Sequence, residues 1–198
     1  TSRYIQQQLT KVGVSFKADI ATTGVVAIIE GNNPGKKTIA LRADIDALPI
    51  TETNTHDYVS TNQGVMHACG HDAHTASLLG VAKILTALKN EFEGTVKLIF
   101  QPSEEKLPGG AAVMIEEGVL ENPKVESIFA QHVFTPFEVG TVAFCFGNML
   151  ASTDEIYITV KGKGGHGAYP HETKDPVVMA AQMLVALQIG RASCRERV

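Results

Sequence analysis

Residues 66–75 constrain the chain more than any other stretch, because they set three imidazoles, one thiol and one carboxylate within ten positions. Cys69 and His71 flank Gly70, and a turn at this glycine lets the thiolate and the imidazole face one point. Both groups suit a transition metal. The alternative is a buried structural cysteine beside solvated histidines. The Cys-x-His spacing, taken alone, favours this alternative over a metal site. The apolar run 73–88 then predicts a helix, so we expect the pair in a loop that enters it.

Apolar runs of two kinds alternate along the first 150 residues. β-Branched runs predict strands at 16–20, 25–29, 38–43, 95–100 and 127–130, and periodic runs predict helices at 4–12, 73–89 and 109–118. The last two of these strands are apolar enough for burial on both faces. Strands that alternate with helices indicate an α/β fold with a mainly parallel sheet flanked by helices.

The pattern changes after about residue 150. Residues 155–160 alternate apolar and polar side chains, which predicts a strand with one wet face, and Asp175-Pro176 predicts the start of a helix at 177–187. We therefore expect one domain at 1–150 and the start of a smaller α+β domain at 151–188. Residues 189–198 break the apolar helical pattern and resemble translated sequencing-adapter read-through. We expect this tail to be non-native, so the native sequence would end near Gln188.

Composition and charge exclude several classes of partner. The net charge of −4 gives no reason to expect nucleic acid or an anionic membrane surface, and no apolar run has membrane-spanning length. The three cysteines, Cys69, Cys145 and Cys194, make no disulfide framework and fit a reducing, cytoplasmic compartment. Because the sequence starts at Thr1 without a Met, we expect it to be cut from a longer protein, which leaves an export signal ahead of it open.

Coordinating side chains follow three of the predicted strands. The first strand end carries Asp44 and Asp46, the second leads to Glu104 and Glu105, and the third leads to His132. In a parallel sheet such ends share one edge, so these groups should meet the Cys69 loop. Adjacent glutamates point apart on an extended chain, so one would bind metal while the other acts as a base. Taken alone, the aspartates could cap a turn and the glutamates could be a solvated pair.

Four ordered motifs carry a resemblance to a known family: Arg-Ala-Asp-Ile-Asp-Ala-Leu-Pro at 42–49, Met-His-Ala-Cys-Gly-His-Asp-Ala-His-Thr at 66–75, Phe-Gln-Pro-Ser-Glu-Glu at 100–105 and Gly-Lys-Gly-Gly-His-Gly-Ala at 162–168. Together they resemble the N-acyl-amino-acid amidohydrolases, which include hippurate hydrolases, indole-acetyl-amino-acid hydrolases and N-acetyldiaminopimelate deacetylases. These enzymes belong to a wider group of dinuclear metallopeptidases. The resemblance covers about residues 1–188 and says little about the substrate.

The resemblance implies a role for each candidate residue. Two divalent ions would be held by four ligands of this sequence, which are Cys69, His71, Glu105 and His132. A further histidine ligand of the family lies beyond this sequence. Glu104 would be the general base, Asp46 would orient a ligand, and His166 of the smaller lid or dimerisation domain would polarise the scissile carbonyl across a homodimer. Manganese or zinc would be the metal, with cobalt and nickel also suitable.

Two other functions remain open from the residues alone. Cys69 could be the nucleophile of a thiol hydrolase beside a histidine, in which case alkylation and not chelation should abolish activity. The 198 residues could also be a non-catalytic, metal-binding fragment of an amidohydrolase.

Overall fold

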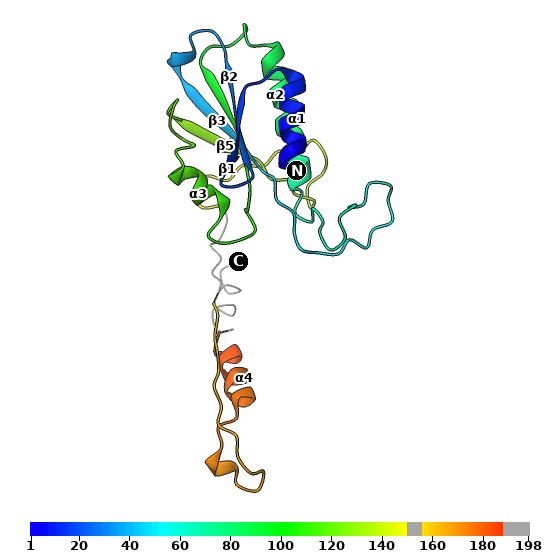
Figure 1. Cartoon of the computed structure of the whole chain (residues 1–198), viewed down its shortest axis with the longest axis vertical. Helices are drawn as coiled ribbons and strands as arrows, with labels where there is room; N and C mark the ends of the chain where they lie inside the picture. Colours follow the sequence, from blue (N-terminus) through cyan, green and yellow to red (C-terminus); the bar gives the residue numbers. More distant parts are fainter. Residues whose placement is uncertain (150–155, 188–198) are drawn as a thin grey trace. The chain divides into compact units, whose positions relative to one another are not determined.

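The computed structural model describes residues 1–149 and 156–187. Contacts divide the chain into two compact units, Thr1–Thr141 and Val142–Val198, and each is described by itself below (Figure 1). The predicted domain boundary at residue 150 and the predicted non-native tail at 189–198 fall on or next to residues outside the described ranges. Both therefore stay predictions.

The first unit is built on a mixed five-stranded sheet. Its strands are β1 (Phe16–Ile20), β2 (Gly24–Glu30), β3 (Thr38–Asp44), β4 (Thr95–Gln101) and β5 (Ser127–Ala130), in the order β1-β2-β4-β3-β5. β4, β3 and β5 run parallel, whereas β1 and β2 pair antiparallel. The predicted α/β class and all five strand positions are confirmed. The parallel part of the sheet is the part that leads to the candidate site residues.

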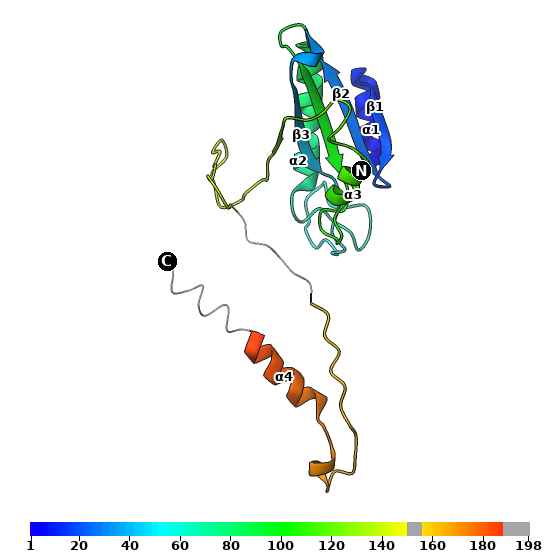
Figure 2. The same ribbon diagram turned by 90° about the vertical axis from the view of Figure 1, so that its left-hand side faces the viewer.

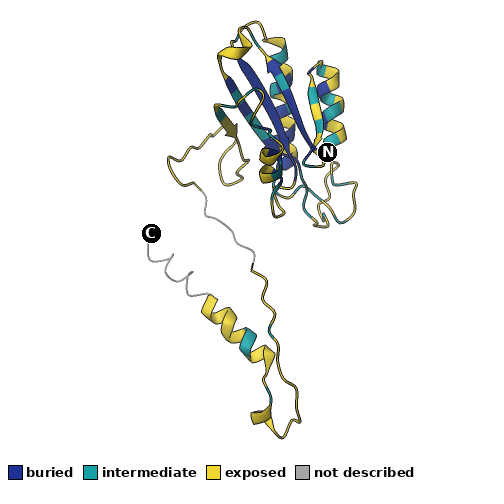
Figure 3. Cartoon of the chain, turned by 60° about the vertical axis from the view of Figure 1, so that its left-hand side comes forward, coloured by how far each residue is buried: buried dark blue, intermediate teal, exposed yellow. Residues whose placement is uncertain are grey.

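Helices cover both faces of this sheet (Figures 1 and 2). α1 (Ser2–Val12) and α2 (His71–Ala87) pack on one face, and α3 (Gly110–Glu116) packs on the other; a short 3-10 helix, η1 (Pro34–Lys36), precedes β3. Alternate residues of β4 point to opposite faces of the sheet, where they join two separate hydrophobic cores. Leu98 and Phe100 join the α1/α2 core, while Ile99 joins the α3 core with Met114. Each such buried side chain contributes about 1.5–3 kcal/mol, so the central strands are firmly held (Figure 3).

The start of α2 differs from the prediction. The helix begins at His71, two residues before the predicted start, so His71 lies in its first turn rather than in the preceding loop. Gly70 makes this possible because it adopts a left-handed conformation with φ 86°. The loop therefore ends at Gly70, and His71 gains the rigidity of a helix.

The predicted burial of β5 is wrong. Ile128 is 52% exposed and Phe129 is 57% exposed, although β4 is buried throughout as predicted. β5 lies at the edge of the sheet, where it pairs with β3 alone, and none of the helices in residues 1–141 packs extensively on it. Hydrophobicity shows which side chains suit burial, but it does not show whether a covering element lies nearby.

The second unit contains one helix in its described part, α4 (Pro176–Leu187), and a short 3-10 helix, η2 (Pro170–Glu172). α4 is confirmed with its predicted cap, since Asp175 Oδ1 accepts the backbone N–H of Val177 at 2.8 Å. The strand predicted at 155–160 does not form in its described part, 156–160. An alternating pattern forms a strand only beside a partner strand, and the described residues of this unit give it none. None of the helices in the described ranges combines the length and hydrophobicity needed to cross a bilayer.

Candidate metal centre

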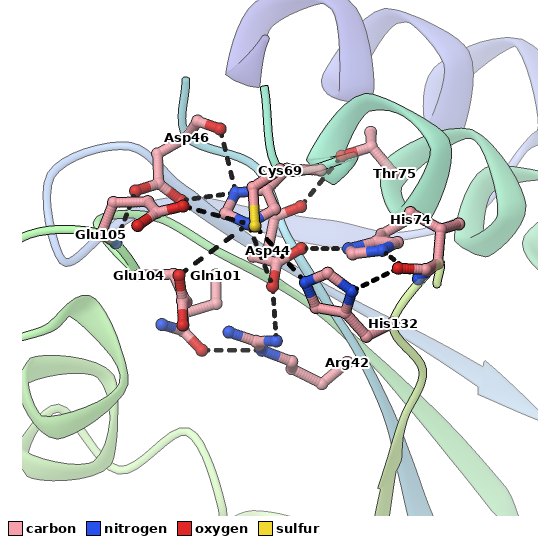
Figure 4. A network of polar contacts seen from close by, with 12 residues as sticks. Arg42, Asp44, Asp46, Cys69, His74, Thr75, Gln101, Glu104, Glu105 and His132 are labelled. Atoms are coloured by element: carbon pink, nitrogen blue, oxygen red, sulfur yellow. Dashed lines mark hydrogen bonds and ion pairs between the residues drawn. The ribbon is translucent and has the colours of Figure 1, made fainter. Parts of the chain in front are cut away.

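The candidate residues converge at one edge of the sheet (Figure 4). In the register of the parallel strands, Asp44 at the end of β3 pairs with Gln101 at the end of β4, and Arg42 pairs with Ala130 of β5. The loops that leave these strands therefore start side by side. This arrangement confirms the expected convergence of the strand ends.

His71 lies at the middle of this cluster and is 2% exposed. Its Nδ1 lies 3.0 Å from the backbone oxygen of Asp46, so Nδ1 carries the ring proton and donates it to this oxygen. Nε2 is left as an acceptor, and in the part of the chain that the structure describes no donor reaches it. The Oδ1 atom of Asp46 is likewise buried without a hydrogen-bond partner there.

Carboxylates surround this unpaired nitrogen. Its nearest acidic atoms are Asp44 Oδ2 at 3.7 Å, Glu104 Oε2 at 3.8 Å and Glu105 Oε1 at 3.9 Å. A lone pair that faces anionic oxygens is unfavourable unless a cation lies among them. The donor set of thiol, imidazole and carboxylate therefore fits a divalent metal.

Cys69 contributes the sulfur of the cluster, and its Sγ lies 3.4 Å from Nε2 of His132. Burial raises the pKa of the Cys69 thiol, and the hydrogen bond to Glu105 and the charges of Glu105, Glu104 and Asp44 raise it further. A nucleophilic cysteine needs a lowered pKa, so these surroundings count against a thiol hydrolase. Carboxylates around a thiol suit a bound cation instead.

The two glutamates do not point apart, which corrects the prediction. That prediction assumed an extended chain, but Ser103 adopts a left-handed conformation with φ 51° and the chain bends after it. Both carboxylates therefore approach His71. Glu105 is further held by its backbone N–H, which donates to Asp46 Oδ2 at 3.0 Å. The Glu104 side chain is 42% exposed and the Glu105 side chain 29%, so Glu104 is the more accessible of the two.

The sequence predicts Asp44 near the Cys69 loop, but it assigns no firm role to Asp44, His74 or Arg42. Asp44 is buried, its Oδ2 accepts Arg42 Nη1 at 2.7 Å, and its Oδ1 lies 2.6 Å from His74 Nδ1. Burial by itself would raise the pKa of Asp44, but the hydrogen bond from His74 and the charge of Arg42 bring it below its usual value. The signal was present in the spacing, because His71 and His74 are three apart and share one face of a helix.

Three sets of ligand atoms lie within 4.8 Å of one another among the described residues: Cys69, His71 and His132; Asp44, His71 and His74; and His71, Glu104 and Glu105. His71 belongs to all three sets. The structure thus brings together the four predicted ligands with Glu104 and Asp46, whereas His166 lies in the second unit. There its ring contacts Tyr169 and its Nδ1 accepts the backbone N–H of Ala168 at 3.2 Å, and its predicted role stays a prediction.

Comparison with known proteins now gives the family. The family model for peptidase family M20/M25/M40 matches residues 40–197, a range that includes most of the tail predicted to be non-native. The chain belongs to this peptidase family. This membership confirms the resemblance to amidohydrolases at the level of the family.

Similar proteins support this assignment. The chain is 42% identical over 188 residues to the N-acyl-L-amino acid amidohydrolase of Geobacillus stearothermophilus, a match that covers 95% of this chain and 50% of that protein. A protein from methicillin-resistant Staphylococcus aureus, described as an aminohydrolase and known from its crystal structure, is 39% identical in sequence. Its TM-score is 0.76, over 94% of this chain and 49% of that one. Bacillus subtilis YXEP, described as a dinuclear metal-binding peptidase of the M20 family, is 42% identical, with a TM-score of 0.61 over 66% of this chain and 36% of that one. The chain thus spans about half the length, or less, of these relatives.

Proposed function

We propose that the complete protein is a metal-dependent amidohydrolase that cleaves the amide bond of N-acyl amino acids and releases a carboxylic acid and an amino acid. The observation that carries this proposal is the buried Nε2 of His71, which has no hydrogen-bond partner among the described residues and lies among carboxylates and beside a thiol. The name of the Geobacillus relative supports the substrate class. We expect a cytoplasmic homodimer that acts on small molecules and binds neither nucleic acid nor membrane.

Four side chains would hold the two divalent ions: Cys69, His71, Glu105 and His132. Manganese or zinc suits this set best, and cobalt or nickel would also fit. When bound, such ions lower the pKa of a coordinated water and polarise a carbonyl oxygen. The backbone oxygen of Asp46 prepares the site by accepting the proton of His71 Nδ1, which leaves the opposite ring nitrogen free to bind.

Glu104 is proposed as the general base. Its carboxylate lies beside the ligand cluster yet is the more exposed of the glutamate pair, so a water and a substrate can reach it. It would accept the proton of the attacking water and return that proton to the leaving amine. His166 would donate a hydrogen bond to the carbonyl oxygen as negative charge develops there, acting in the partner subunit's site.

The test of this proposal is Glu104→Gln in the complete protein. Loss of a general base should lower kcat about 10²- to 10⁴-fold, while elemental analysis should find the metal content unchanged. Glu91→Gln, at an exposed position of the loop before β4, is the matched control and should keep full activity. Substrates would be N-acetyl, benzoyl and indole-acetyl amino acids, each with every candidate divalent metal.

Inhibitors separate this proposal from thiol catalysis. Chelators should abolish activity, and activity should return when metal is restored. Near-normal turnover of Glu104→Gln would refute the role of Glu104. Activity that resists chelation but is lost on treatment with iodoacetamide would instead support Cys69 as a nucleophile.

A further inference from the structure

We propose that His74 is a positioning residue that holds the segment carrying His132 against Cys69, and that it is not itself a metal ligand. The inference rests on the proposed function, because it concerns the same metal site. His74 is 1% exposed and lies one helical turn after His71 on α2. Its distance from Asp44 and His71 would equally suit a ligand, so its hydrogen bonds decide between the two roles.

Both ring nitrogens of His74 are engaged. The backbone N–H of Val133 donates to Nε2 at 2.9 Å, so Nε2 bears no proton. The single proton of the neutral ring therefore lies on Nδ1, which donates to Asp44 Oδ1 at 2.6 Å. No lone pair of the ring is left for a metal, although the ring lies close to two potential ligands.

Val133 is the point where the His132 segment docks on α2. Besides its N–H bond to His74, its side chain packs so closely on Gly70 that a Cβ added there would lie 2.3 Å from Val133 Cγ2. Its carbonyl oxygen lies 2.6 Å from Nδ1 of His132. This contact turns Nε2 of His132 toward the sulfur of Cys69, 3.4 Å away.

The segment is also held at Gln131, whose Nε2 donates to Ser77 Oγ of α2 at 2.8 Å, but this bond lies ahead of His132. His132 and Val133 are both exposed, and they follow a four-residue edge strand. The position of His74 is fixed through Asp44, because Asp44 also accepts a hydrogen bond from Arg42. The Nε of Arg42 in turn donates to Gln101 Oε1 at 2.8 Å. A hydrogen-bonded chain thus runs from the edge of β3 and β4 through His74 to the backbone beside His132 (Figure 4).

Two substitutions separate the two hydrogen bonds of His74. In His74→Asn the short amide can still donate to Asp44, but it does not reach the Val133 N–H. In His74→Gln the longer side chain places an amide oxygen near the position of Nε2 and restores the acceptor. The matched control is Thr75→Val, which removes a buried hydrogen bond from Thr75 to the backbone oxygen of Asp44, 3.1 Å long, in the same turn of α2.

The measurement is Co²⁺ binding by the complete protein, followed by the sulfur-to-cobalt charge-transfer band and by competition with a chelator. We expect His74→Asn to weaken Co²⁺ binding about 10- to 100-fold with unchanged stoichiometry. His74→Gln should recover most of this loss. Thr75→Val should lower the thermal midpoint but leave Co²⁺ affinity unchanged.

The decisive control is the His132→Ala background. If His74 acts through His132, adding His74→Asn to His132→Ala should cause no further loss of Co²⁺ affinity. If the losses of Co²⁺ affinity from the two single variants add in the double variant, or if both His74 variants bind fewer Co²⁺ ions, His74 is a ligand and the proposal is overturned. Wild-type affinity in His74→Asn would overturn it as well. Those results leave the proposed function intact, whereas a wild-type protein that binds no Co²⁺ overturns both.

Discussion

Lys97 and His71 are both buried polar residues of the first unit, but the protein treats them in opposite ways. Lys97, in the middle of β4, is 2% exposed, and its ammonium donates to three backbone oxygens, those of Val119 at 2.9 Å, Glu121 at 2.8 Å and Pro123 at 3.0 Å. His71 is equally buried, yet its Nε2 has no donor among the described residues.

The difference separates a structural buried group from a functional one. A buried charge costs free energy unless the protein supplies partners, and Lys97 has a partner for each of its three protons. The cluster around His71 instead collects acceptors that face one another, an arrangement that a cation from solution would complete. The surroundings of Lys97 should therefore be stable without any added ligand, whereas the cluster around His71 should be stabilised by added metal.

The largest expected effect comes from Lys97→Met. The substitution keeps most of the side-chain volume but removes the donor from three carbonyl oxygens, one buried and two partly buried, at about 1–3 kcal/mol for each group left unsatisfied. We expect a loss of at least about 3 kcal/mol, measured by urea unfolding of the complete protein. Lys89→Met, at an exposed position, is the control and should change little. Metal affinity should stay the same in both variants. A Lys97→Met protein as stable as wild type would remove the structural half of the comparison.

The sequence predicts the two residues unequally, and the reason is physical. Cysteine, histidine and glutamate at strand ends are recognisable by residue type, so most residues of the cluster could be named in advance. The predicted strand positions also placed the cluster at one edge of the sheet. The partners of Lys97 and one partner of His74 are backbone groups, which every residue carries, so only the folded chain shows them. The same holds for the exposure of β5, because packing depends on neighbours that periodicity does not reveal.

The second effect is the stabilisation of the site by metal. A ligand that binds only the folded state at 100 times its Kd stabilises that state by about 2.7 kcal/mol, so zinc or manganese should raise the unfolding midpoint of chelator-treated protein. Cys69→Ser should lose most of this rise, whereas Lys97→Met should keep it despite its lower starting stability. Differential scanning calorimetry gives the midpoints, and elemental analysis gives the metal content. Unchanged metal stoichiometry in Cys69→Ser would rule out Cys69 as a ligand.

The smallest effect concerns Asp44, because a single carboxyl group titrates. Burial raises the pKa of Asp44, but the His74 hydrogen bond and the Arg42 charge together outweigh it, so the pKa in the folded protein lies below the ordinary value of 3.8. Its ionised form therefore stabilises the fold above pH 3.8, and this contribution is lost as the pH falls through the lower, folded pKa. Asp44→Asn should flatten the acid limb of stability against pH in chelator-treated protein. The exposed Asp57→Asn should leave it unchanged. Identical acid limbs in all three proteins would show that Asp44 gains no more from its partners than burial costs it. The metal would then be needed to stabilise Asp44 as well as His71.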